Sequence, residues 1–354
     1  MVLVLGVSAG AGGARAMLTH SDQPHLPPID RCAVPRRPGV GVEDPVLDAI
    51  DLMRDSADRR GEVVSGIAVT TRCDRHAEAI RAIAGRTRLT IVDEPLAQLN
   101  YLRFTGQLPR RGSVLLYDLG SSGLTLTEAD CRTDAILAAT RGTVVGGDGH
   151  DALLRHQLAH EGVSVCTSTI RDYKEQLSST PVVTASDPIR RTRAVLTRSD
   201  FFELVRAGVD HSVTAVRELI ADSGVVPDAL VLLGGCTRNP GIREELEQSF
   251  NLPVVYDPEP ESVSARGAVM MAAPQPSTRW IHGFRCPVRQ ALPPPPVHGV
   301  PRRRVAAALA VTAALGATVT GLLVTDSKPA PPTGHVPDSH LDVAGTHTGP
   351  WGPR

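Results

Sequence analysis

Apolar residues in the first 273 positions cluster in short runs that are separated by glycine-rich or polar turns. Runs of this length, bounded by turn signals, are typical of buried strands. Other segments repeat their apolar residues every three or four positions, as the buried face of a helix does. The pattern predicts strands at 2–7, 15–18, 63–70, 89–92, 113–119, 124–127 and 230–233, and a strand that ends at 146–147. It predicts helices at 45–54, 76–84, 96–102, 153–158, 170–177, 200–223 and 242–250. Residues 20–42 are predicted to form a loop.

The longest predicted helix shows all the signals of a stable amphipathic element. Ser199 is a favourable N-cap, and Asp200 and Glu203 in the first turn complement the helix dipole. Gly224 stands where glycine commonly ends a helix. The apolar stripe of this helix consists of Val205, Val209, Val213, Val216 and Ile220.

The stretch VLLGGCTRNPGI, residues 231–242, joins an apolar strand to a helix through Gly234 and Gly235. Paired glycines let a backbone approach a flat ligand because no Cβ intervenes. The following helix offers free N–H groups and the positive end of its dipole. The stretch therefore predicts a ligand-binding turn at the carboxyl end of a strand, and the alternative is an ordinary strand-to-helix connection.

Two further glycine-rich turns follow strands. Residues 8–13, SAGAGG, come directly after the first strand, and Gly120 to Gly123 come directly after Asp118. Backbone N–H groups in such turns can wrap phosphate. A strand that leads an acid onto a glycine turn predicts a metal-and-phosphate element, and the alternative is a hairpin whose aspartate satisfies turn N–H groups.

Composition narrows the range of functions. The 354 residues carry a net charge of −1 and 3% aromatic residues, which gives a nucleic-acid partner neither electrostatic nor stacking support. The six cysteines are scattered singly with no CxxC pair, which favours small buried residues in a reducing cytoplasm. Lys174 and Lys328 are the two lysines, so no mechanism can use a lysine within the first 173 residues.

The character of the chain changes after residue 273. Residues 274–304 are rich in proline and end in three arginines, which predicts a semi-rigid linker. Residues 305–325 are 21 uncharged residues, long enough to span a bilayer. A buried core helix is the alternative. The arginines on the amino side predict a single-pass cell-membrane protein whose amino-terminal domain is cytoplasmic and whose tail, 326–354, is disordered and outside.

Taken together, six segments resemble the ATPase domain of the DnaK-type heat-shock chaperones, in the actin and sugar-kinase superfamily. VLLGGCTRNPGIREELEQSF is similar to the family's adenosine element LVGGSTRIPxVxxLL, and PESVSARGAV, after it, to PDEAVAYGAA. Upstream, VDEPLAQLNYL resembles NEPTAAALAYG, YDLGSSGLTLT resembles the second phosphate loop DLGGGTFDVS, VVGGDGHDALL resembles LGGEDFDNRL, and LTRSDFFELV resembles LTRAEFE. The segments follow the order of the family.

The resemblance implies an α/β, two-lobed actin-like ATPase fold built from ribonuclease H-like repeats around a nucleotide cleft. We expect a reduced first lobe at 1–117 and a second lobe at 118–273 that returns to the first, followed by the linker and a C-terminal transmembrane helix. The resemblance ends before the peptide-binding domain of the family, and we expect the linker and membrane helix in its place.

The resemblance also implies a site for ATP or ADP with Mg²⁺. Glu94 and Asp118 would be catalytic, and Asp118 would hold the metal through water. The adenosine would lie between the turn with Arg238, which stacks on the base, and a clamp helix that carries the lysine and serine of the family. The nucleotide-binding residues implied in this way are Gly10, Gly12, Gly120, Ser121, Ser122, Gly123, Gly146, Gly147, Lys174, Ser178, Gly234, Gly235, Thr237 and Arg238.

The phosphate side departs from the family pattern. In the first phosphate loop, DLGTTNS in the family, the acid is replaced by Ser8 and both threonines are gone. The family's first-lobe lysine has no counterpart, and in the second loop Gly123 replaces a threonine and Thr125 an acid. Phosphoryl transfer depends on charge placed around the γ-phosphate, so we expect slow or absent ATP hydrolysis.

Three functions remain open at this point. The first is a membrane-anchored nucleotide-dependent switch with weak or absent hydrolysis. The second is an active chaperone-type ATPase that assists protein folding. The third is a nucleotide-free, actin-like scaffold at the membrane. All three predict a protein partner that the sequence does not identify, and no nucleic acid.

Overall fold

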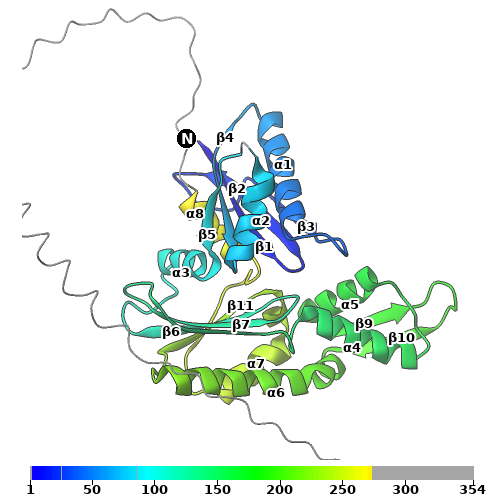
Figure 1. Cartoon of the computed structure of the whole chain (residues 1–354). Helices are drawn as coiled ribbons and strands as arrows, with labels where there is room; N and C mark the ends of the chain where they lie inside the picture. The colour runs from blue at the N-terminus through cyan, green and yellow to red at the C-terminus, as the bar shows by residue number, and fades with distance from the viewer. Residues whose placement is uncertain (1, 25, 86, 273–354) are drawn as a thin grey trace, which may run out of the picture. The chain divides into compact units, whose positions relative to one another are not determined.

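The computed structural model describes residues 2–24, 26–85 and 87–272 (Figure 1). The predicted linker at 274–304, the predicted span at 305–325 and the predicted tail at 326–354 lie outside the described residues. Among the described residues, no helix combines the length and the apolar character that a membrane crossing requires.

The first sheet has the strand order β3-β2-β1-β4-β5. β1 pairs antiparallel with β2, and β2 with β3, whereas β4 and β5 extend the sheet in parallel on the other side of β1. The strands are β1 (Leu3–Gly10), β2 (Gly13–His20), β3 (Asp30–Pro35), β4 (Val64–Thr71) and β5 (Thr90–Asp93).

Helices cover both faces of this sheet because β1 is buried on both sides. Leu5 and Val7 pack with α1 (Glu43–Arg59) and α2 (Asp74–Ala84), while Val4 packs with α3 (Glu94–Phe104) and α8 (Val263–Met271). Gly6 permits the contact with α8, since a Cβ there would lie 2.3 Å from the carbonyl oxygen of Ala265. The last described helix therefore returns to the first sheet.

The second sheet repeats this plan with the order β12-β11-β6-β7-β8. An antiparallel meander is again extended in parallel beyond its first strand. The strands are β6 (Ser113–Leu119), β7 (Leu124–Asp130), β8 (Ile136–Gly142), β11 (Ala229–Leu233) and β12 (Val254–Tyr256). Two mixed sheets with the same strand pattern are consistent with the expected actin-like fold, and the second sheet begins slightly before the expected boundary at 117.

The helices around the second sheet are α4 (Gly147–His160), α5 (Thr167–Ser179), α6 (Arg198–Ser223) and α7 (Pro240–Ser249). A hairpin of β9 (Val182–Ser186) and β10 (Arg193–Thr197) separates α5 from α6, and a 3-10 turn, η1 (Gly235–Arg238), precedes α7. Figure 1 shows α6 and α7 on one side of this sheet, with α4, α5, β9 and β10 grouped together at its end.

Helix α6 confirms most of its predicted features. The stripe valines are at most 5% exposed, and Gly224 takes a left-handed conformation with φ of 67°. The predicted N-cap was wrong, because Thr197 caps the helix. Its hydroxyl accepts from the Asp200 backbone N–H at 3.1 Å, and the Asp200 carboxylate accepts in return from the Thr197 N–H.

Other differences from the predicted elements have local causes. The predicted loop at 20–42 contains β3, whose residues alternate between half-buried and exposed without an apolar run. The predicted turn at 8–13 is tighter, because Ser8 and Gly10 belong to β1 and only residues 11–12 form the turn. The strand predicted to end at 146–147 ends instead at Gly142, where β8 lies mostly exposed.

Candidate functional site

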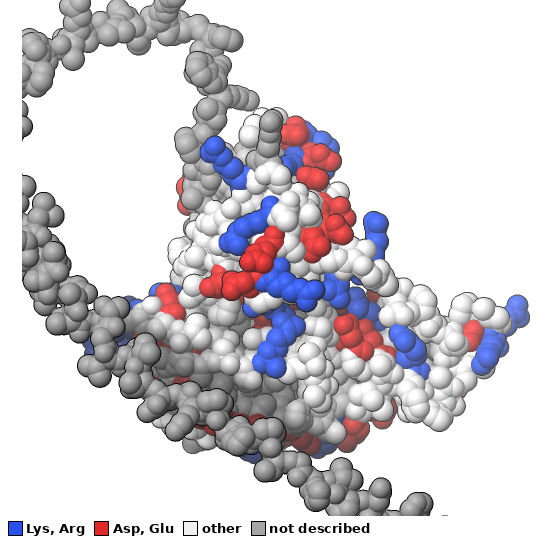
Figure 2. Space-filling model, viewed as in Figure 1, with Lys and Arg blue, Asp and Glu red and all other residues white. Residues whose placement is uncertain are grey.

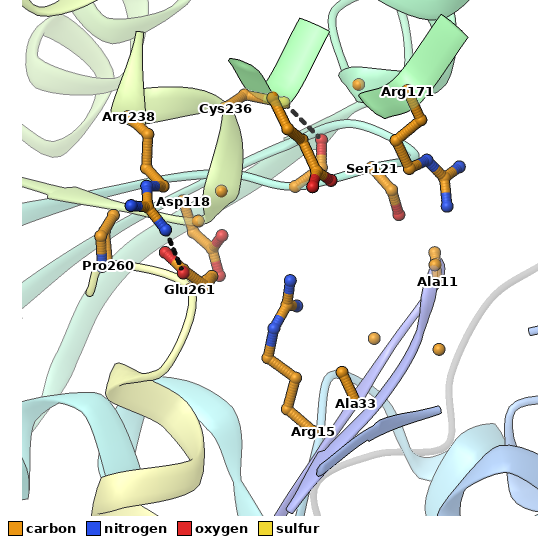
Figure 3. A pocket seen from close by; sticks show the side chains of 18 of the residues that line it. Ala11, Arg15, Ala33, Asp118, Ser121, Arg171, Cys236, Arg238, Pro260 and Glu261 are labelled. Carbon is orange, nitrogen blue, oxygen red and sulfur yellow. Dashed lines mark hydrogen bonds and ion pairs between the residues drawn. The ribbon is translucent and has the colours of Figure 1, made fainter. Parts of the chain in front are cut away.

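A cavity of about 410 Å³ lies between the two sheets. Its walls come from the β1–β2 hairpin, the residues after β4 and β5, the turns after β6 and β11, and helix α5. Figure 3 shows Ala11 and Arg15 on the hairpin side, opposite Asp118, Cys236 and Arg238. The site is thus assembled from strand ends of both sheets, where open α/β sheets commonly bind ligands.

Most of the predicted nucleotide-binding and catalytic residues line this one cavity. Those on its wall are Gly10, Gly12, Glu94, Asp118, Gly120, Ser121, Gly147, Lys174, Ser178, Gly234, Gly235 and Arg238. Four others lie behind the wall and shape it: Ser122, Gly123, Gly146 and Thr237. Residues from segments up to 228 positions apart in the chain therefore converge, as the predicted cleft requires.

The turns after β6 and β11 pack too closely for side chains. Gly234 has φ of 81°, and a Cβ there would lie 2.4 Å from the Leu119 carbonyl oxygen and 2.6 Å from Asp118 Oδ1. Behind this turn, the Thr237 hydroxyl donates to the Gly234 carbonyl oxygen at 2.8 Å. The glycines of VLLGGCTRNPGI thus bring its backbone against Asp118 at the floor of the cavity.

The wall expected to hold the adenosine is fixed by charged contacts. Lys174 Nζ donates to the Gly147 carbonyl oxygen at 2.9 Å and lies 2.6 Å from Asp151 Oδ1. Across the cavity, Arg238 Nη1 lies 2.8 Å from Glu261 Oε1 (Figure 3), yet almost half of the Arg238 side chain stays exposed. The Arg238 side chain is therefore partly accessible to a ligand, whereas the Lys174 ammonium is bound to the oxygens of Gly147 and Asp151.

A buried arginine joins the two predicted catalytic acids. Arg72 directly follows β4 and Glu94 directly follows β5, and the pairing of these strands places the two residues side by side. The Arg72 guanidinium forms an ion pair with Glu94, and its Nη2 also donates to Asp118 Oδ2 at 3.1 Å. The exposed fractions of the three side chains are only 12%, 6% and 8%.

Two neutral side chains complete this network. Gln98, one turn after Glu94 on α3, donates from Nε2 to Asp118 Oδ2 at 3.1 Å and to the Ser264 hydroxyl at 3.0 Å. Ser264, on α8, donates to Glu94 Oε1 at 3.1 Å. Burial opposes the charge on Arg72, but Glu94 and Asp118 outweigh it and raise the pKa of Arg72, which stays cationic.

The family model described as Hsp70 protein matches residues 70–278, more than half of the chain. The chain belongs to the Hsp70 family. Its matched region carries a chaperone-like ATP-binding domain of that family and includes both predicted catalytic acids. The hairpin with Ser8, where the sequence departs most from the family pattern, lies before the matched region.

Curated relatives agree with this assignment. The chain is 28% identical over 262 residues to the chaperone protein HscA homolog of Burkholderia multivorans. The aligned region covers 66% of this chain and 42% of that protein. It is 25% identical over 276 residues to the chaperone protein HscA of Salmonella newport, and this aligned region covers 70% of this chain and 44% of that protein. The chain thus spans less than half the length of the curated relatives it matches.

The acids of this Hsp70-family chain do not fit a magnesium ion. Mg²⁺ requires near-octahedral oxygen ligands and at a nucleotide site usually binds through one or two carboxylates, several waters and the substrate phosphates. Here the Glu94 oxygens and Asp118 Oδ2 accept hydrogen bonds from Arg72, Gln98 or Ser264. An ion next to them would also meet the guanidinium charge. The described part of the chain contains no cluster of three His, Cys, Asp or Glu side chains that could hold a metal.

Sequence reasoning missed Arg72, Arg15, Gln98 and Ser264. The chain has no lysine in the first lobe, but arginine can supply a cation in its place. A usable signal was present, because Arg72 and Glu94 each follow a predicted strand. Parallel neighbours bring such ends together.

A further buried group that lines the cavity is His150 of α4. The ring is 4% exposed, packs edge-on against Phe201 at 6.0 Å, and has no hydrogen-bond partner for Nε2 among the described residues. Burial, reinforced by the Lys174 charge and opposed by Asp151, lowers the pKa of His150 to about 4.

His150 should therefore destabilise the fold in acid. The unfolded chain binds a proton on this imidazole near its ordinary pKa, and the folded chain does so only at a lower pH, so stability falls as pH drops below 6.5. We expect His150→Phe to remove about 2 kcal/mol of the loss in unfolding free energy between about pH 7 and pH 5. Urea denaturation of the full chain measures this loss. The exposed His211→Phe is the control, and an unchanged pH dependence in His150→Phe contradicts the prediction.

Proposed function

We propose that this protein is a membrane-anchored, DnaK-like ATP-binding protein that acts as a nucleotide-dependent switch with weak or absent ATP hydrolysis. The observation that carries the proposal is the contrast between the two halves of one cavity. The half expected to hold adenosine keeps its glycine turn, Lys174, Ser178 and Arg238 on the wall. In the other half, an arginine forms ion pairs with both acids that would catalyse hydrolysis.

Nucleotide binding fits the dimensions and chemistry of the cavity. Its volume lies within the range of about 300–1,000 Å³ that is usual for small-molecule sites. The Arg238 guanidinium can stack on a base, and the glycine turns let backbone N–H groups approach phosphates. The relatives are named chaperones, and their nucleotide chemistry is extended to this chain only as part of the proposal.

Slow hydrolysis follows from the phosphate half. Glu94 is buried, and burial, together with the nearby Asp118 charge, raises its pKa against the opposing effect of Arg72. Both Glu94 oxygens and Asp118 Oδ2 already accept hydrogen bonds from protein side chains, which reduces their capacity to orient an attacking water. Ser8 supplies no charge where the family has an acid. A bound nucleotide would therefore act by shifting the equilibrium between conformations of the lobes, according to its differential affinity for them.

One prediction from the proposed function concerns nucleotide binding and ATP turnover by the full chain in detergent micelles. Saturating ADP or ATP should raise the melting temperature, with a stabilisation of about 2.7 kcal/mol at 100 times Kd. Phosphate release should be slow or indistinguishable from that of the protein-free control. No stabilisation at millimolar nucleotide contradicts the proposal, and robust phosphate release would favour the active chaperone-type ATPase instead.

Two variants locate the binding site. Arg238→Ala should raise Kd by about threefold to thirtyfold, because stacking on the base is lost while the fold is kept. Lys174→Ala should also weaken binding, and its melting temperature without nucleotide shows whether loss of the Asp151 pair disturbs the fold. Arg217→Ala, an exposed arginine on α6 outside the cavity wall, is the matched control and should leave Kd unchanged.

A further prediction concerns membrane topology. Residues 305–325 should cross the membrane with the arginines at 302–304 on the cytoplasmic side. Alkaline phosphatase fused after Arg354 should therefore be active in intact cells, and the same reporter fused after Arg304 should be inactive. Activity patterns of the opposite kind, or two inactive fusions, overturn the single-pass arrangement.

A further inference from the structure

Arg72 holds the position between the two acids where a bound cation would lie. Its Nε and Nη2 groups face the Glu94 carboxylate, and Nη2 also reaches Asp118 Oδ2 at 3.1 Å. The guanidinium comes from the first sheet and Asp118 from the second, so the cation bridges both walls of the cavity. A metal ion could enter only if Arg72 moved away and left a buried charge without its partners, which is strongly unfavourable.

Two N–H donors of the same guanidinium, those on Nη1, are not used by the contacts to the acids. An arginine has five N–H groups, and the contacts to Glu94 and Asp118 use those on Nε and Nη2. Nη1 has no hydrogen-bond partner within the described ranges, and it lies 3.5 Å from the position of a Cβ on Gly120. Gly120 begins the glycine turn expected to wrap phosphates, and Arg72 also lines the cavity. Nη1 is therefore placed to donate to a phosphate oxygen in that turn.

A second arginine supplies the remaining charge from the opposite wall. Arg15, on β2, points into the cavity in Figure 3. Within the described part of the chain its guanidinium has neither a hydrogen bond nor an ion pair, whereas Arg171, Lys174 and Arg238, which line the same cavity, are paired with acids. Figure 2 shows basic and acidic side chains next to each other on the surface in view.

We propose that Arg72 and Arg15 replace the divalent cation of this site, so that the protein binds nucleoside di- or triphosphates without a metal ion. The two guanidinium groups together carry the charge of one divalent cation. Arg72 offsets part of the negative charge of the two acids and contacts the phosphates through Nη1, and Arg15 adds a second positive charge from the hairpin. This inference rests on the proposed nucleotide binding and adds that the binding is independent of Mg²⁺.

The test measures the Kd of ADP for the full chain in detergent micelles by calorimetry, once with Mg²⁺ and once with EDTA. The inference predicts that EDTA changes Kd by less than about fivefold, which is about 1 kcal/mol. A larger weakening in EDTA overturns the inference but leaves the proposed function standing. No binding in either buffer contradicts the proposed function, and the inference fails with it.

Variants of the two arginines give an independent readout. Arg15→Gln should raise Kd about tenfold or more in both buffers, because a charge-assisted phosphate contact is lost. Arg37→Gln, an exposed arginine beyond the same hairpin, is the matched control and should bind like the parent. If Arg15→Gln binds as tightly as this control, the assignment of Arg15 is wrong.

Removal of Arg72 should create a metal requirement. In Arg72→Gln the acids lose their cation, so ADP binding should weaken about tenfold or more in EDTA and recover with Mg²⁺. Because this variant leaves buried acids unpaired, Arg72→Gln/Glu94→Gln provides a charge-balanced second version, which should bind weakly in both buffers. If either variant folds and binds ADP in EDTA like the parent chain, Arg72 does not act as the cation.

Discussion

The ion pairs of Arg72 with Glu94 and Asp118 are the contact on which the rest of the site depends. They join the ends of β4, β5 and β6 and are supported by Gln98 from α3 and Ser264 from α8, so both sheets contribute. Removing one partner of such a buried network typically costs about 3–5 kcal/mol, because the remaining charges are left unpaired. The geometry of the cavity floor and its chemistry therefore have the same physical origin.

The network also gives a physical reason for the proposed combination of nucleotide binding with weak or absent hydrolysis. The glycine turns after β6 and β11 retain a backbone that admits a ligand, and α5 places Lys174 and Ser178 on the wall. Catalysis requires preorganised charge that is free to act in the transition state. The acids here accept hydrogen bonds from an arginine, an amide and a hydroxyl. These contacts hold the carboxylates in place but do not orient them toward an attacking water.

The sequence predicted those parts of the fold that depend on local patterns. Apolar runs located β6 and β11, and the valine stripe and Gly224 described α6, because burial and helix ends leave direct marks on residue type. β3 was missed and the end of β8 was misplaced, because edge strands with few buried residues have no clear apolar run. The glycines and acids of the site could be located through the family motifs, whereas the only sequence signal for Arg72 was its place after a predicted strand, since its contacts depend on the pairing of strand ends and on Asp118 of the other sheet.

The most direct test of this account is a crystal structure of the full chain grown with ADP and Mn²⁺, with anomalous scattering recorded at the manganese edge. The account predicts ADP in the cavity, its phosphates in contact with Arg72 and Arg15, and no manganese peak between Glu94 and Asp118. A manganese peak at that position, with Arg72 turned away from the acids, would contradict it.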